Sequence, residues 1–337
     1  MLNTIWFLLI AVLMTLYAIL DGFDLGVGNL HLFARGEEER RLFIKSIGPV
    51  WDGNEVWLLT GGGALFAAFP PVYATVFSGF YLAMMLVLVA LIMRAVGVEF
   101  RSKVESPSLK ALWDKFFFLG SFLASILFGV AVGNLMRGIP IDETGTFTGS
   151  FLGLLNPYSV FMGIVSLAMF TLQGATYLAL RTAGGLRARV SGWAMRLWAA
   201  FAVLYLVAAF WTLGVSPHLY HRYYSVGWNW VTITLFVAAM VALPVFLKGR
   251  RFGWAFASSS LAIAGLTSTL ALSAYPMLAP SSTNLDYSLT AFNASSSPLT
   301  LQTMLILALI GVPLVLGYTV YIYSVFMGKV DGSTPGY

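Results

Sequence analysis

Long apolar segments separated by short polar connections dominate this chain. Nine segments hold about twenty predominantly apolar residues each, the length that a helix needs to cross a hydrocarbon core of roughly 30 Å. The pair Pro70 and Pro71 divides the uncharged run between Val56 and Met93 into two of these segments. The pattern predicts an all-α polytopic membrane protein, with a single integral membrane domain over 1–337. The nine predicted transmembrane helices lie near residues 3–28, 50–69, 72–94, 116–136, 158–180, 194–214, 228–247, 252–276 and 299–327.

A weak internal similarity suggests how these helices are grouped. The segment LDGFDL at 20–25 resembles LQGATY at 172–177, with two of the six positions identical. Neutral residues in the second segment stand where the first has Asp21 and Asp24. Chance explains such a match about as well as duplication does. The predicted units are two four-helix bundles and one peripheral helix, over 1–136, 158–276 and 299–327.

The composition agrees with a membrane protein. Hydrophobic residues make up 59% of the chain and charged residues 10%, whereas soluble domains are about 25% charged. There is no cysteine, which excludes disulfides, thiolate metal sites and iron–sulfur clusters. The first twenty residues lack a basic region and a small-residue cleavage site, so we predict a retained first helix and not a signal peptide.

The distribution of Lys and Arg predicts the orientation in the membrane. Seventeen of the nineteen basic residues lie in alternate connections and in the tail, and only Arg137 and Arg222 lie on the other side. Since Lys and Arg accumulate in cytoplasmic loops, the N-terminus is predicted outside and the C-terminus in the cytoplasm. The basic residues flank apolar segments, so no nucleic-acid partner is expected. The Ser-, Thr- and Asn-rich stretch 280–298 is then predicted to be a solvated outer loop.

Two acidic residues are predicted to lie within the membrane at the start of the second helix. The apolar run 56–69 supplies about 21 Å of helix, which is too short to cross the bilayer. The helix must therefore include Asp52 and Glu55 at its cytoplasmic end. The first helix runs in the opposite direction, so it brings Asp21 and Asp24 to the same side.

These four carboxyl groups form two pairs with i,i+3 spacing, and each pair lies on one helical face. An ionised acid that faces lipid costs ~2.5–3.5 kcal/mol, so the acids must face protein or water. We predict a proton pathway, with Asp52 and Asp24 as its leading candidates. The alternative is that the acids only cap helix ends. The predicted pathway residues are Asp52, Asp24, Asp21 and Glu55, and the supporting residues are Trp51, Asn54 and the counter-ion Arg94 at the cytoplasmic end of the third helix.

Glycines occur within two of the predicted helices. The run GGG at 61–63 lies inside a span and lacks a following GK[ST], so it is not a phosphate-binding loop. It indicates either close helix packing or a broken helix that lines a cavity. We favour packing there, and also for the small-residue pair Gly22 and Gly26.

Histidine is scarce, and none lies in the middle of a predicted span. His31 is at the end of the first helix, and His218 and His221 are in an outer loop that we expect to be solvated. A bundle that holds haem normally needs an inward-facing axial ligand, most often histidine. We therefore predict that this chain ligates neither a haem nor another metal ion.

Several segments resemble subunit II of the cytochrome bd-type quinol oxidases. They are LDGFDLGVG, GPVWDGNEVWLLTGGGALFAAFPPVYATVFSGFYLAMMLVL, FGVAVGNLMRGIP, LQGATYLALRT and YPMLAPSS, in order through nearly the whole chain. The resemblance implies a heterodimeric respiratory complex of a bacterial or archaeal cell membrane that oxidises quinol and reduces dioxygen to water. It also implies that b-type and d-type haems are held by a partner, subunit I.

In the family that these segments resemble, subunit II stabilises subunit I and contributes acids to a cytoplasmic proton channel. Asp52 and Asp24 match those acids. Many members have Gln where Glu55 stands, so the resemblance implies no required charge there. No motif decides which quinone is used, or whether a structural quinone or a small accessory subunit binds.

Two other functions remain open on the sequence. The possible repeat and the glycines are compatible with a proton-coupled secondary transporter. The chain could also be a scaffold subunit without any role in proton transfer.

Overall fold

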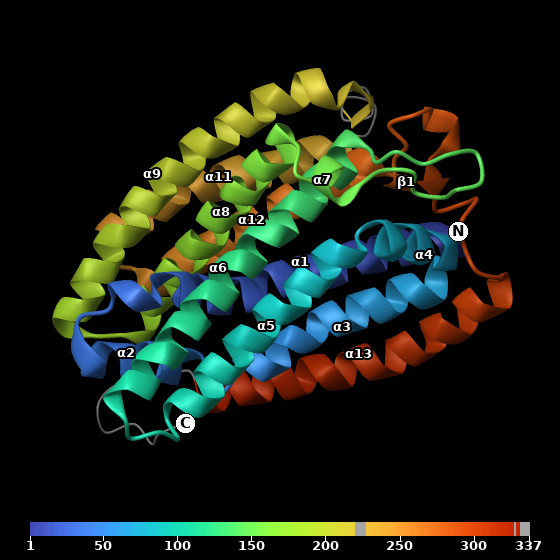
Figure 1. Ribbon diagram of the computed structural model, residues 1–337. Coiled ribbons are helices and arrows are strands. Elements are labelled where there is room, and N and C mark those ends of the chain that lie inside the picture. Colours follow the sequence, from blue (N-terminus) through green and yellow to red (C-terminus); the bar gives the residue numbers. More distant parts are fainter. Residues whose placement is uncertain (220–226, 327, 331–337) are drawn as a thin grey trace.

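The computed structural model describes residues 1–219, 227–326 and 328–330, so His221 and Arg222 lie outside the described residues. This part of the chain is a bundle of long helices, with short elements at both ends (Figure 1). The elements with regular structure are α1 (Leu2–Leu30), η1 (His31–Phe33), α2 (Gly36–Ile47), α3 (Trp51–Ala68), α4 (Pro70–Gly79), α5 (Tyr81–Arg101), α6 (Pro107–Arg137), α7 (Phe151–Leu154), α8 (Pro157–Arg181), α9 (Gly184–Val215), α11 (Trp228–Lys248), α12 (Phe252–Ala274), β1 (Met277–Ala279), η2 (Leu285–Tyr287), β2 (Leu289–Thr290) and α13 (Pro298–Phe326).

Eight of the described helices are long and apolar enough to cross a membrane, namely α1, α5, α6, α8, α9, α11, α12 and α13. A further helix, α3, has eighteen residues and packs against α1. Its first turns contain Asp52, Asn54 and Glu55, and it is not among the eight helices above. The all-α polytopic architecture is confirmed, while the count of nine transmembrane helices and the orientation stay predictions.

The bounds predicted for the third helix, 72–94, are wrong because the helix is interrupted at Phe80. The short helix α4 ends at Gly79, and α5 then continues to residue 101. A loop beyond α6 occupies the bend: the ring of Phe147 lies 6.2 Å from the ring of Phe80, and a Cβ at Gly79 would meet Phe147 at 2.5 Å. Arg94 consequently lies in the interior of α5 and not at the end of the helix, where it was predicted.

Two helices begin earlier than predicted. The start of α6 lies at residue 107 instead of 116, and that of α9 at residue 184 instead of 194. Their first turns are polar, so hydropathy does not mark them as part of a span. The backbone hydrogen bonds of a helix also form outside the membrane, and the two helices therefore extend beyond their apolar segments. Asp114 therefore belongs to α6 and not to a connection.

The helices α1 and α8 cross in direct backbone contact at two glycines. A Cβ at Gly26 would lie 2.6 Å from the backbone nitrogen of Gly174, and a Cβ at Gly174 would lie 2.6 Å from Cα of Gly26. The ring of Phe170 occupies the corresponding space at Gly22. The packing role predicted for Gly22 and Gly26 is confirmed, and it holds the centre of the bundle together.

The three consecutive glycines of α3 do not break this helix, which runs without interruption from residue 51 to 68. The alternative of a broken helix is therefore wrong. Gly61 lies against the side chain of Met14, whereas a Cβ at Gly62 or Gly63 would meet no atom within 4 Å. Close packing within the chain thus applies to Gly61 alone among the three.

The stretch 280–298, predicted to be a solvated loop, is exposed at 282–286 and is elsewhere partly folded onto the helices. Strand β1, just before this stretch, pairs antiparallel with β2 in its middle, and Ser281 and Ser288 are buried. The hydroxyl of Ser296 donates to the backbone oxygen of Ala67 at 2.6 Å. These contacts place the start of α13 beside the end of α3 (Figure 1).

Candidate functional site

The helices α1, α3 and α5 bring charged side chains together inside the bundle. Asp21 on α1 is fully buried, and Arg94 on α5 is 1% exposed. Nη1 of Arg94 donates to Oδ1 of Asp21 at 2.6 Å, and Nη2 pairs with the carboxylate of Glu55 on α3. Arg94, the counter-ion proposed from the sequence, thus pairs with both carboxylates and links three helices through one guanidinium group.

The indole of Trp51 covers this ion pair. Cζ of Arg94 lies 5.9 Å from the centroid of the Trp51 ring, which is within the range of cation–π attraction. Trp51 is itself buried, so it shields the guanidinium from lipid and water. The predicted supporting residue thus contacts the cation and not a carboxyl group.

Asp24 is held by a hydrogen bond from α3. Nδ2 of Asn54 donates to Oδ2 of Asp24 at 2.7 Å, and Oδ1 of Asn54 accepts a hydrogen bond from the hydroxyl of Tyr323 at 2.9 Å. The other carboxyl oxygen of Asp24, Oδ1, is buried and has no hydrogen-bond partner among the described residues. Sequence analysis missed Tyr323, because it lies on α13 and no local spacing connects it with Asp24.

We call Asp21, Asp24, Glu55 and Arg94 the acidic cluster. It contains three carboxyl groups and one guanidinium group. A buried charge costs several kcal/mol unless it is paired, so the ionisation of all three carboxyl groups would leave an unbalanced excess of negative charge. The cluster is therefore suited to bind and release protons as the charge of its surroundings changes.

Asp52 is not part of the acidic cluster. Its side chain is exposed on α3, as are its neighbours Gly53 and Val56, whereas the side chain of Glu55 is 22% exposed. The structure thus brings together three of the four predicted acids and leaves Asp52 on the outer face of the helix. An ionisable group there has to meet water or another protein chain, because lipid does not solvate it.

A second buried network, which sequence analysis did not predict, surrounds Asp114 of α6. Oδ1 of Asp114 lies 2.5 Å from Nε2 of His31 and also accepts from Nε of Arg101. Its Oδ2 accepts from Nη1 of Arg40 at 3.1 Å. These bonds join η1, α2, α5 and α6 at the end of the bundle where α2 lies (Figure 1).

Arg101 connects this network to the surface. Its guanidinium donates to both carboxyl oxygens of Glu37, at 3.1 and 2.8 Å. These hydrogen bonds hold the pKa of Glu37 below its ordinary value. Arg94 and Arg101 are two turns apart on α5, so they lie on the same face and anchor this helix to two separate groups of acids.

Comparison with known proteins identifies the family. Residues 2–326 match the family described as cytochrome bd terminal oxidase subunit II. The chain belongs to this family. The resemblance found in the sequence is confirmed, and the comparisons give no support to the transporter alternative.

Two relatives of this subunit II cover nearly its whole length. The chain is 41% identical over 360 residues to cytochrome bd-I ubiquinol oxidase subunit 2 of Escherichia coli (strain K12), covering 98% of this chain and 95% of that protein. It is 36% identical over 336 residues to cytochrome bd ubiquinol oxidase subunit 2 of Bacillus subtilis (strain 168), covering 99% and 98% respectively.

The fold of the subunit is also similar to that of a solved oxidase. A chain in the structure of bd oxidase from Geobacillus thermodenitrificans matches with a TM-score of 0.78 and 18% identity, covering 96% of this chain and 98% of that chain. At this identity the match supports the fold alone.

The described residues of this subunit II include no group of three or more His, Asp or Glu that could hold a metal ion. His31, the histidine nearest the acidic cluster in the sequence, is bonded to Asp114 at the end of α1. Its position agrees with the prediction that no histidine lies in the middle of a span.

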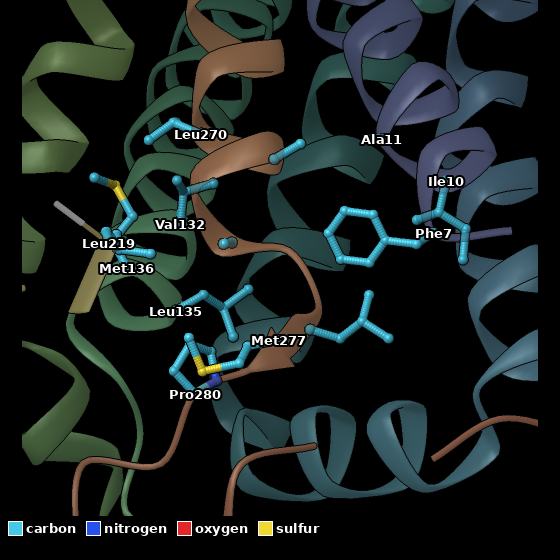
Figure 2. A pocket seen from close by; sticks show the side chains of 13 residues that line it. Phe7, Ile10, Ala11, Val132, Leu135, Met136, Leu219, Leu270, Met277 and Pro280 are labelled. Carbon is cyan, nitrogen blue, oxygen red and sulfur yellow. The ribbon is translucent and has the colours of Figure 1, made fainter. Parts of the chain in front are cut away.

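Figure 2 shows a pocket of different character near the start of α1, and this end of the bundle is opposite α2 in Figure 1. Side chains of α1, α6, α12 and the following strand line it, among them Phe7, Leu135, Leu270 and Met277. None of the described residues that line it is ionisable. The pocket is therefore chemically unrelated to the acidic cluster.

Proposed function

We propose that this subunit II takes up protons from the cytoplasm for a haem-bearing partner, in a complex that oxidises quinol and reduces dioxygen to water. The observation that carries the proposal is the acidic cluster, in which Arg94 pairs with Asp21 and Glu55, and Asn54 binds Asp24 one turn further along α1. Its relatives in Escherichia coli and Bacillus subtilis are subunits of ubiquinol oxidases, which supports the assignment to a quinol oxidase.

The arrangement of the acids suggests a route. Asp52 lies on the face of α3 that is open to a partner, and Glu55 lies one turn deeper on the same helix, about 4.5 Å along its axis. Glu55 shares Arg94 with Asp21, and Asp24 lies one turn from Asp21 on α1. In this proposal Asp52 connects the acidic cluster to the partner subunit.

We assign the b-type and d-type haems to partner subunit I, because the sequence of this chain places no histidine in the middle of a span. We place the complex in the bacterial cell membrane, with nine transmembrane helices per subunit II and the N-terminus outside. Quinol is the proposed substrate of the complex. A structural quinone and a small accessory subunit are not needed for the proposed role.

The test is to purify the complex through a tag on this chain, in wild-type and Asp52→Asn forms. We expect both preparations to contain a haem subunit with a d-type absorption band. Oxygen consumption by the variant should fall by about a hundredfold, the lower end of what a positioned proton-transfer group contributes. The matched control is Asp286→Asn, since Asp286 is an exposed acid in the stretch between β1 and β2.

Full oxygen consumption by Asp52→Asn, with unchanged haem content, would remove Asp52 from the route. A preparation of the wild-type chain that is active without any haem-bearing partner would contradict the proposal as a whole.

A further inference from the structure

The helix α13 contributes little to the core but reaches the acidic cluster with one side chain. Among the described residues of this helix, Leu301 alone is buried, and the rest of the helix packs loosely against α1 and α3. Near its first turn, Nε1 of Trp6 donates to the backbone oxygen of Leu301 at 2.9 Å. Near its last turn, the hydroxyl of Tyr323 bonds to Oδ1 of Asn54. The second contact is therefore the one that concerns the acids.

The hydrogen bonds of Asn54 define which way its amide points. Its NH₂ group lies 2.7 Å from a carboxyl oxygen of Asp24. If the amide were flipped, its oxygen would face this carboxyl oxygen, and an ionised Asp24 could donate no hydrogen bond to it. Its second contact with α1, to the backbone oxygen of Leu20, is longer at 3.4 Å. The hydroxyl of Tyr323 satisfies the amide oxygen and so favours the orientation in which Asn54 donates to Asp24.

We propose that Tyr323 is a positioning residue for Asp24, acting through Asn54. The inference rests on the proposed role of the acidic cluster in proton uptake. An amide does not carry protons readily, so the chain from Tyr323 to Asp24 orients the donor and does not relay protons. By holding that donor, α13 stabilises the ionised form of Asp24 and helps it to release its proton.

Other groups face Asp24 as well, and they limit the size of the effect. Asp21 lies on the same helix, Glu55 on α3, Arg94 on α5 and Tyr177 on α8. Removal of the Tyr323 hydroxyl leaves all of them in place. The change should therefore adjust the proton affinity of Asp24 without abolishing its function.

The experiment compares Tyr323→Phe and Tyr321→Phe in the complete oxidase purified from membranes. Tyr321 lies on the same helix but is 63% exposed, so it serves as the matched control. Oxygen consumption per haem is measured with quinol over a series of pH values. For Tyr323→Phe we expect about a fivefold loss of turnover, as for the loss of one hydrogen bond, and a pH profile displaced toward alkaline values. Tyr321→Phe should retain the wild-type profile.

A second pair of variants tests whether Tyr323 acts through Asn54. In an Asn54→Ala background, Tyr323→Phe should cause no additional change, because the amide that it orients is gone. A wild-type turnover and pH profile for Tyr323→Phe would overturn the proposal. So would a loss of haem content with an unchanged profile per haem, since that result indicates a purely structural hydroxyl.

The outcome for Asp24→Asn separates this inference from the proposed function. If Asp24→Asn has wild-type turnover, the proton-uptake role of the acidic cluster fails. If Asp24→Asn is impaired and Tyr323→Phe is indistinguishable from wild type, only the positioning role of Tyr323 fails.

Discussion

Replacement of Arg94 with leucine is expected to eliminate the assembled complex from the membrane. The change leaves the carboxyl groups of Asp21 and Glu55 without the cation that pairs with both. Removal of one partner from a buried ion pair costs roughly 3–5 kcal/mol, which is a large part of the 5–15 kcal/mol that stabilises a typical protein. The measurement is the d-type haem absorption of membranes together with the amount of tagged chain.

Two further variants show whether the effect belongs to the site. Arg94→Lys keeps the charge but loses the forked geometry that reaches both carboxyl groups, so it should restore part of the complex. Arg196→Leu removes an exposed arginine of α9 and should leave the amount of complex unchanged. Normal haem absorption and turnover in Arg94→Leu would mean that the ion pairs contribute little to the structure.

Replacement of Gly26 with valine should also prevent assembly, for a steric reason. At this position a side chain would run into the backbone of α8, including the nitrogen of Gly174 at 2.6 Å from the new Cβ. Backbone atoms cannot move aside as a flexible side chain can, so α1 and α8 must separate. Overpacking of this kind costs about 3 kcal/mol or more. The amount of complex in membranes and its thermal stability in detergent measure the effect.

The matched control is Gly62→Ala in α3. A Cβ at Gly62 would meet no atom within 4 Å, and alanine favours a helix over glycine by about 1 kcal/mol. We expect this variant to assemble normally. If Gly26→Val assembled as well as Gly62→Ala, the close crossing of α1 and α8 would not be essential to the subunit.

Much of the helical architecture could be predicted from the sequence, because the membrane imposes one rule of length and polarity. The predicted segments 158–180 and 252–276 correspond closely to α8 and α12. The break at Phe80 could not be predicted, since it depends on Phe147 from a distant loop. The early starts of α6 and α9 were missed because polar turns beyond the hydrocarbon leave no apolar signal.

The acidic cluster was predictable in its members but not in its geometry. Charged side chains inside a membrane need partners, and this requirement indicated from the sequence that Asp21, Asp24 and Arg94 lie near one another. The relative positions of Asp52 and Glu55 depend on the rotation of α3 about its axis. Apolar residues and glycines occur all around this helix, so the pattern does not show which acid points inward. The structure places Glu55 on Arg94 and leaves Asp52 exposed.

The contacts of Asp114 and Tyr323 lay beyond sequence reasoning for a different reason. Each joins segments that are far apart in the chain, such as α6 with His31 and α13 with Asn54. Hydrogen bonds of this kind depend on how the helices pack, and they leave no periodic signal along one segment.

Proton uptake during a single turnover tests the central claim most directly. The purified complex is fully reduced, blocked with carbon monoxide and mixed with oxygen. A light flash then releases the carbon monoxide so that oxygen can react, while a pH-sensitive dye reports protons taken from solution. We predict that uptake in Asp24→Asn is slower than in the wild type by about tenfold or more, with unchanged haem content. Uptake at the wild-type rate in Asp24→Asn would contradict the account.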